Sequence, residues 1–165
     1  MTEPRRIYWD SAAFLAYLME ETENNRLMRC EYTLGLANAG HIQIVTSALT
    51  LTEVIHLKGE IPIPAEKEKK VKDFFLNEWI VIHTVDRKIA EEARQHVWRN
   101  GVKPKDSIHV ATAIRVRAEV LETFDTGLLK KSGVIGNPPL IISKPQSPLN
   151  VGLYDPSEGV IDGDA

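Results

Sequence analysis

Four acidic residues lie where the chain is expected to change from one secondary-structure element to the next. They are Asp10, Glu53, Asp106 and Asp125. Asp10 follows the short apolar run at 7–9, and Asp125 follows the expected strand at 120–124. Carboxylates brought to one place repel one another, and a hard divalent cation with oxygen ligands relieves that repulsion. Such ions can activate a water, orient a phosphate and stabilise a leaving oxygen. The four acids therefore predict a site for Mg²⁺ or Mn²⁺.

Each acid also has a plainer explanation when it is considered alone. An aspartate at a strand end is often a turn residue or a helix cap, which applies to Asp10 and Asp125. Asp106 opens an expected helix, where free backbone N–H groups favour a carboxylate. Glu53 lies in a largely apolar stretch, and a buried acid needs a partner, which favours a functional role. Asp86 precedes a helix in the same way and is expected only to cap it.

The elements that must position these acids alternate along the chain. Strands are expected at 7–9, 42–46, 79–82, 120–124 and 140–142. Helices are expected at 11–21, 25–38, 48–58, 66–76, 87–99, 106–117 and 126–131. This alternation predicts an α/β fold of three layers, α/β/α, with a central parallel sheet of about five strands. Ligands of such sheets bind outside the carboxyl ends of the strands, so Asp10 and Asp125 share a rim if their strands are neighbours.

Length and composition predict one domain followed by a tail. Residues 1–142 carry the apolar periodicity, whereas 143–165 form a Pro/Gly-rich, acidic C-terminal extension that is expected to be partly disordered. No apolar run approaches the length of a membrane span, and no signal peptide is recognised. Cys30, the single cysteine, is expected in the core and suits a reducing, cytoplasmic compartment.

Histidine and lysine side chains are further candidates for the same site. The five histidines show no zinc-ligand spacing, although His109 follows Asp106 by three residues and is expected near the site. Lys103 and Lys105 flank Asp106, and their roles in RNA binding or in solubility stay open. The net charge of −3 argues against a protein that grips long duplex DNA, but not against a metal-dependent enzyme acting on RNA.

At these residues the sequence resembles the PIN-domain ribonucleases, and within them the VapC-like toxins of bacterial toxin–antitoxin pairs. The resemblance covers roughly residues 6 to 142. It depends on four segments: IYWDS at 7–11, TSALTLTEV at 46–54, KDSIHVATA at 105–113 and TFDTGL at 123–128. The four segments occur in the family's order at plausible spacing, so they are more specific together than any of them alone.

The resemblance implies an activity and a set of partners. In that family the four acids matched here by Asp10, Glu53, Asp106 and Asp125 serve an endoribonuclease that uses Mg²⁺ or Mn²⁺. A toxin of this kind acts on RNA, is held by a cognate antitoxin and commonly forms a homodimer. Many members carry a further acid three residues after the fourth, where this chain has Leu128, and a tail like 143–165 is unlike a minimal toxin.

Other functions fit the sequence less well. A PIN-domain nuclease of RNA processing or phage defence, without an antitoxin, is the nearest alternative. A phosphatase or phosphotransferase usually places a second aspartate two residues after the first, and Ala12 stands there. A receiver-like signalling module needs an acid after the third strand, where His83 and Thr84 stand. A catalytically silent binding protein would not need all four acids.

Overall fold

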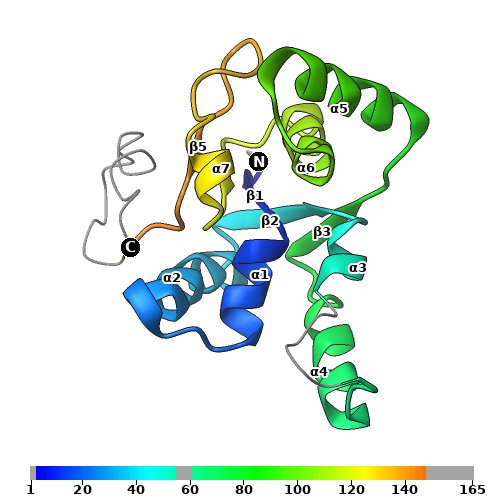
Figure 1. Ribbon diagram of the computed structural model, residues 1–165. Coiled ribbons are helices and arrows are strands. Elements are labelled where there is room, and N and C mark those ends of the chain that lie inside the picture. The colour runs from blue at the N-terminus through cyan, green and yellow to red at the C-terminus, as the bar shows by residue number, and fades with distance from the viewer. Residues whose placement is uncertain (1–2, 55–60, 148–165) are drawn as a thin grey trace.

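The computed structural model describes residues 3–54 and 61–147, and five parallel strands form its one sheet (Figure 1). The strands are β1 (Arg5–Trp9), β2 (Ile42–Ser47), β3 (Ile80–His83), β4 (Val120–Glu122) and β5 (Ile142–Ser143). Their order across the sheet is β3-β2-β1-β4-β5, and every neighbouring pair is parallel. The predicted fold class and strand number are confirmed, although β4 ends two residues earlier than expected.

Helices connect the strands in the expected order. They are α1 (Ser11–Leu18), the 3-10 helix η1 (Glu23–Asn25), α2 (Arg26–Asn38), α3 (Thr50–Glu53), α4 (Ala65–Phe74), α5 (Arg87–Asn100), α6 (Pro104–Arg115) and α7 (Thr126–Leu129). The helix predicted at 48–58 is the four-residue α3, and 55–60 lie outside the described residues. Asp86 caps α5 as predicted, accepting a hydrogen bond from the Ile89 amide at 2.8 Å. Gly101 ends that helix with a φ of 65°, which favours glycine.

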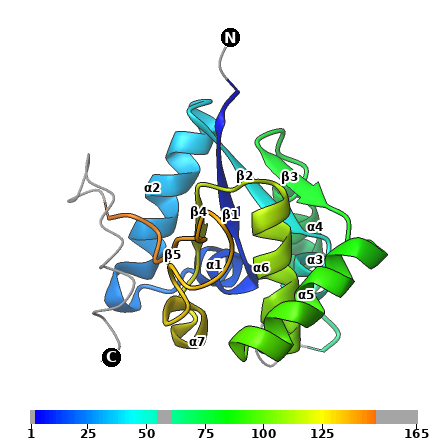
Figure 2. The same cartoon turned by 90° about the horizontal axis from the view of Figure 1, so that it is seen from above.

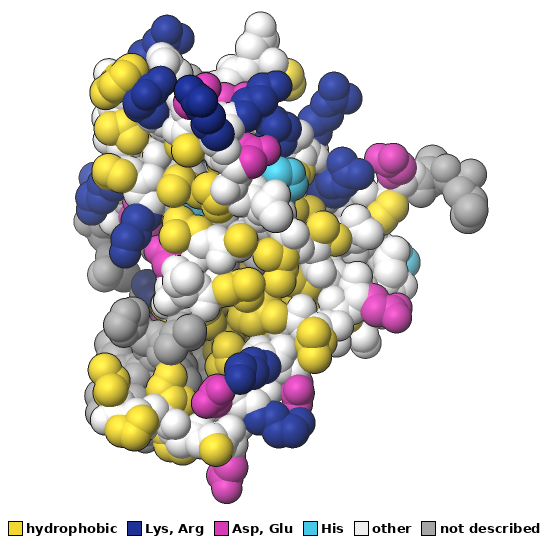
Figure 3. Space-filling view, turned by 90° about the vertical axis from the view of Figure 1, so that its right-hand side faces the viewer, with side chains coloured by type: hydrophobic (Ala, Val, Ile, Leu, Met, Phe, Trp, Pro, Cys, Tyr) yellow, Lys and Arg dark blue, Asp and Glu magenta, His cyan; other side chains and the backbone are white. Residues whose placement is uncertain are grey.

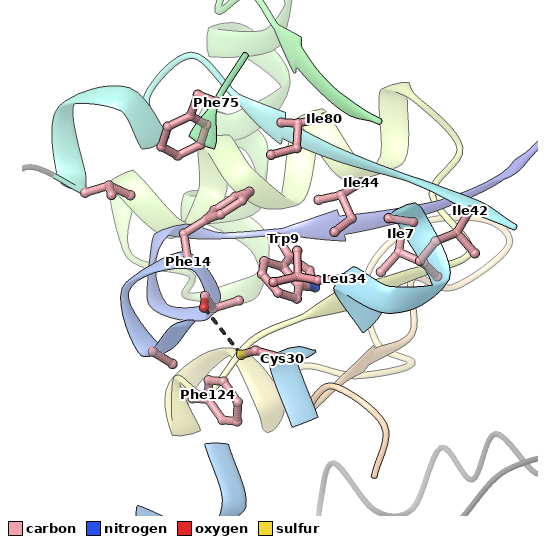
Figure 4. Close-up of a cluster of buried hydrophobic side chains, with 14 of the residues drawn as sticks. Ile7, Trp9, Phe14, Cys30, Leu34, Ile42, Ile44, Phe75, Ile80 and Phe124 are labelled. Carbon is pink, nitrogen blue, oxygen red and sulfur yellow. Dashed lines mark hydrogen bonds between the residues drawn. The ribbon is translucent and has the colours of Figure 1, made fainter. Parts of the chain in front are cut away.

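Helices cover both faces of the sheet, with α1 and α2 on one side and α6 on the other (Figures 1 and 2). The larger core lies on the first side, where Trp9 and Phe14 pack edge to face at 5.1 Å between ring centroids (Figure 4). Cys30 belongs to this core, is fully buried and lies 3.6 Å from the Ala13 carbonyl oxygen, as Figure 4 shows. Burial raises the pKa of its thiol, so Cys30 is a core residue, as predicted.

The smaller core lies between the other face and helices α6 and α7, and it includes Leu128. Leu128, the position that the resemblance drawn from the sequence compares with a fifth acid, is thus a buried apolar side chain. Helix α5 packs on the outer side of α6 through Ile89 and Ala93.

The C-terminal extension begins in contact with the rest of the protein. Ser143 is part of β5, and the Pro145 carbonyl oxygen accepts a hydrogen bond from Arg29 of α2 at 2.9 Å. The remainder of the extension, 148–165, lies outside the described residues. Within the described part of the chain, no helix is long and apolar enough to cross a membrane.

The strand order creates a switch point between β1 and β4. From β1 the chain proceeds to β2 and β3 on one side, and then returns to the other side for β4 and β5. Trp9 at the end of β1 is in register with Glu122 at the end of β4. The residues that follow these two strands therefore emerge together at the edge where open α/β sheets bind ligands.

Candidate active site

Asp10 and Asp125 follow the two strands of the switch point, and Thr123 links them. The Thr123 hydroxyl donates a hydrogen bond to Asp10 Oδ2 at 2.5 Å and accepts one from the Asp125 amide at 3.0 Å. The pairing of β1 with β4 meets the condition under which Asp10 and Asp125 were expected to share a rim. The two acids therefore lie at the same rim.

Asp10 is buried, with 3% of its surface exposed. Its Oδ1 caps α1 by accepting a hydrogen bond from the Ala13 amide at 3.1 Å. Burial raises the pKa of this carboxyl to about 6, against the opposing effects of His109, Thr123 and the Ala13 amide, and the charge of Asp106 adds to the rise. Asp10 therefore does cap α1. Capping alone, however, would not require its carboxylate to be buried, where the ionised form is destabilised.

Asp125 is half-buried and caps the short helix α7. Its Oδ1 accepts a hydrogen bond from the Gly127 amide at 2.7 Å. A side chain at position 127 would place its Cβ 3.2 Å from that oxygen, so glycine allows the close approach. Asp125 also raises the pKa of Asp106, which shows that the two carboxylates lie within electrostatic reach of each other.

Asp106 lies in the first turn of α6 and is half-buried. Burial raises the pKa of its carboxyl, and the charges of Asp125 and Glu53 raise it further, while His109 and Lys103 act in the opposite direction. Its carboxylate accepts no hydrogen bond from any residue in 3–54 or 61–147. Asp106 therefore has both oxygens available for another partner.

Glu53 is the last residue of α3, and its partner is His109. His109 Nε2 donates a hydrogen bond to Glu53 Oε1 at 2.8 Å. Burial would raise the pKa of Glu53, but the bond and charge of His109, the charge of Lys105 and a bond from Ser11 outweigh it, so the pKa is lowered. The carboxylate is ionised at neutral pH, and His109 is the partner that its largely buried side chain requires, although the neighbouring Leu51 and Thr52 are exposed.

The four acids thus influence one another electrostatically at one rim, and their oxygens are the donors that Mg²⁺ and Mn²⁺ prefer. Among the described residues, no three acidic, histidine or cysteine side chains already form a ligand group for one ion. The donor set fits a hard cation because its members are carboxylates, and burial, followed by neighbouring carboxylates, makes the ionised forms of Asp10 and Asp106 costly. Binding would require side chains to turn from their present partners toward the ion.

The sequence did not indicate how three residues organise the rim. Thr123 was part of a recognised segment, but its bond to Asp10 was not anticipated. His109 was expected near the site, yet it is 1% exposed and contacts Glu53 and Tyr8, so it does not face substrate. Tyr8 was read only as a strand residue. The polar residues at 106, 109 and 112, which follow one another at helical spacing in a largely apolar segment, were the available signal for His109.

The fold and the rim define a three-layer α/β protein with clustered acids at the switch point of a parallel sheet. The chain belongs to the PIN domain family, whose model matches residues 7–134.

Two solved structures share this fold. The toxin VapC20 of Mycobacterium tuberculosis, described as cleaving the sarcin–ricin loop, aligns with a TM-score of 0.55 and 14% identity over 72% of this chain and 89% of that one. A toxin–antitoxin complex from Klebsiella pneumoniae aligns with a TM-score of 0.58 and 19% identity over 86% of this chain and 98% of that one. No match was found among curated proteins.

Proposed function

We propose that the protein is a metal-dependent endoribonuclease that hydrolyses RNA phosphodiester bonds. The observation that carries the proposal is the convergence of four acids at the β1–β4 switch point of a PIN fold, with the pKa of buried Asp10 raised to about 6. Water and protein dipoles do not compensate this charge fully, whereas a divalent ion would. The toxin fold of the two solved structures supports the same conclusion.

In this mechanism the four acids would hold Mg²⁺ or Mn²⁺, and the neighbouring lysine side chains would bind the RNA. When bound, the ion supplies positive charge that activates a water and stabilises the leaving oxygen. Asp10, Glu53, Asp106 and Asp125 orient it, directly or through water. Lys103 and Lys105 are exposed beside Asp106 and already influence the acids, so they are placed to contact phosphates. No covalent nucleophile is needed.

A divalent ion is expected to stabilise the protein and to switch on cleavage. The unfolded chain separates the four acids, so the ion binds the folded state preferentially. At about 100 times the dissociation constant, Mn²⁺ should raise the free energy of unfolding by roughly 2.7 kcal/mol. In a chain of this size that corresponds to a rise in melting temperature of about 5 to 10 °C. Thermal denaturation and cleavage of a single-stranded RNA, each with Mn²⁺ and with EDTA, measure both effects. An unchanged melting temperature at excess Mn²⁺ would contradict the site.

The solved structures favour a toxin as the biological role of this nuclease, because one of them is a toxin–antitoxin complex. We propose a small cognate antitoxin as the partner that holds this protein inactive. The second candidate, a nuclease of RNA processing or phage defence, differs in lacking an antitoxin gene directly upstream of its own. The cleavage chemistry at the rim is the same in both cases.

We also propose that the protein forms a homodimer through the face that carries edge strand β3. Hydrophobic side chains gather in the middle of this face, between α4 and α5 (Figure 3). Val81 of β3, Val85 just after that strand and Leu51 of α3 are exposed apolar residues, with 38 to 39% of their surfaces accessible. A second copy would cover both this apolar surface and the outer edge of β3. Light scattering at tens of micromolar should show a dimer, and Val81→Lys should yield a monomer; a wild-type monomer would overturn the assignment.

A further inference from the structure

A buried histidine connects the acidic rim to the interior of the protein. His109 lies one helical turn after Asp106 on α6 and is 1% exposed. Both ring nitrogens are engaged: Nδ1 lies 2.7 Å from Tyr8 Oη, and Nε2 lies 2.8 Å from Glu53 Oε1. The ring therefore has no nitrogen left to bind an ion or a substrate in this arrangement, and a different role must explain its place.

Chemistry fixes the direction of these two hydrogen bonds. An ionised carboxylate only accepts, so His109 Nε2 carries the proton that is donated to Glu53. In a neutral ring the other nitrogen is then an acceptor. Tyr8 Oη lies 2.7 Å from Nδ1, and a phenol hydroxyl donates to the acceptor nitrogen of a neutral ring. Tyr8, His109 and Glu53 thus form a directed chain.

Glu53 depends on this chain because its own helix offers little support. Helix α3 has four residues, and so short a helix has little stability of its own. Its start is anchored through Thr50, whose hydroxyl lies 2.7 Å from that of Thr46, which in turn donates to the Trp9 carbonyl oxygen. These bonds fix the backbone beside the end of β1. They do not hold the long Glu53 side chain, whose carboxylate is bound by His109, with a further contribution from Ser11.

The ring also lies among the other acids. It belongs to the same helix as Asp106, one turn further on, and its bond to Tyr8 joins it to β1, the strand that Asp10 follows.

We propose that Tyr8 and His109 are positioning residues that hold Glu53 Oε1, so that the other Glu53 oxygen faces Asp10 and Asp106 and completes the metal site. The proposal rests on the function proposed above. A carboxylate has two oxygens, and fixing one of them orients the other. Hydrogen-bond partners of this kind around metal ligands typically change metal affinity or activity by about 10- to 100-fold when they are removed.

Two substitutions of the same histidine separate positioning from packing. His109→Gln places an amide nitrogen near the position of Nε2 and keeps a donor for Glu53. His109→Asn places its amide near Nδ1 and loses that donor. Calorimetric titration of the full chain with Mn²⁺ should show about 10-fold or weaker binding for His109→Asn, and His109→Gln should recover at least half of that loss on a logarithmic scale. Melting temperatures in EDTA report the packing defect separately.

Tyr8→Phe tests the other end of the chain and serves if His109→Asn fails to fold. The ring of Tyr8 is kept, but His109 loses the donor that holds its proton on Nε2, so Mn²⁺ binding should weaken by about 3-fold or more. Wild-type Mn²⁺ affinity in both Tyr8→Phe and His109→Asn would overturn the positioning role and leave the nuclease proposal intact. Failure of the wild-type protein to bind Mn²⁺ would overturn both.

Discussion

Asp10→Asn is expected to lose Mn²⁺-dependent RNA cleavage by at least about 100-fold. The amide keeps the shape of the side chain but removes the charge that holds a hard cation. A loss of about 3 kcal/mol of transition-state stabilisation, within the range that a bound ion supplies, corresponds to that factor. The fold should survive, because asparagine caps helices as well as aspartate does and Asp10 caps α1. Gel analysis of a labelled single-stranded RNA measures the change.

The same substitution should stabilise the metal-free protein at neutral pH. The carboxyl ordinarily ionises near 3.8, but in the folded state its pKa is about 6. The folded state therefore holds the proton more tightly, and stability falls as pH rises from about 4 to about 6. Above that range the ionised group destabilises the protein by on the order of 2 to 3 kcal/mol, which Asp10→Asn removes. Melting in EDTA at pH 7.5 should occur about 5 °C higher or more.

Asp86→Asn is the matched control, because Asp86 caps α5 with the same geometry. Each side chain accepts a bond from the amide three residues later, and both backbones are extended, with φ of −84° and −92°. Only Asp10 lies at the rim of clustered acids. Cleavage should persist in Asp86→Asn. Equal activity in Asp10→Asn would remove Asp10 from the site and undercut the assignment of all four acids.

The fold was predictable because its signals are local. Apolar runs such as 42–46 alternate with helical periodicity, and this alternation indicates a parallel sheet wherever it occurs. Asp86 could be assigned a capping role because a cap involves residues only three apart. Element ends were less certain: α6 ends at Arg115 and not at 117, since the sequence there does not contain a single strong stop signal.

The connections within the site were not predictable because they join distant parts of the chain. Glu53 and His109 are 56 positions apart, Tyr8 and His109 are 101 apart, and Asp10 and Thr123 are 113 apart. No periodicity or cap signal links residues at such separations. The sequence could show that Glu53 needed a partner, but the choice of His109 follows from the packing of α6 beside β2. Side-chain partners of this kind are a property of the assembled sheet.

Glu122 is a further buried acid that was not anticipated, although a charged residue inside the run 120–124 was a visible signal. It lies on β4 beside the larger core and is 3% exposed. Its Oε1 accepts bonds from Trp9 Nε1 at 2.7 Å and from the Thr33 hydroxyl at 3.1 Å. Burial raises its pKa to about 7, against the opposing effects of Trp9, Thr33, the Gln146 backbone and Arg29.

This shift makes the stability of the protein depend on pH between about 4.5 and 7. In the unfolded chain Glu122 loses its proton near 4.5, whereas the folded protein keeps it until about pH 7. The folded state binds more protons across this window, so stability falls as pH rises and the loss is complete above about pH 7. The total effect of this one group is roughly 3 kcal/mol.

Glu122→Gln should therefore remove a pH-dependent loss of stability of about 3 kcal/mol, equivalent to about 6 to 12 °C in melting temperature. The quantity to compare is the wild-type melting temperature minus that of the variant, in EDTA, from pH 4.5 to pH 8. It should fall through the window and be flat above it, whatever constant offset the altered hydrogen bonds introduce. Asp10 is present in both proteins, so its titration largely cancels in the difference. Glu119→Gln is the control, because a bond from Arg5 lowers the pKa of that exposed carboxyl, and its difference should not fall with rising pH. A difference for Glu122→Gln that stays constant from pH 4.5 to 8 would show that the buried carboxyl titrates like one in water.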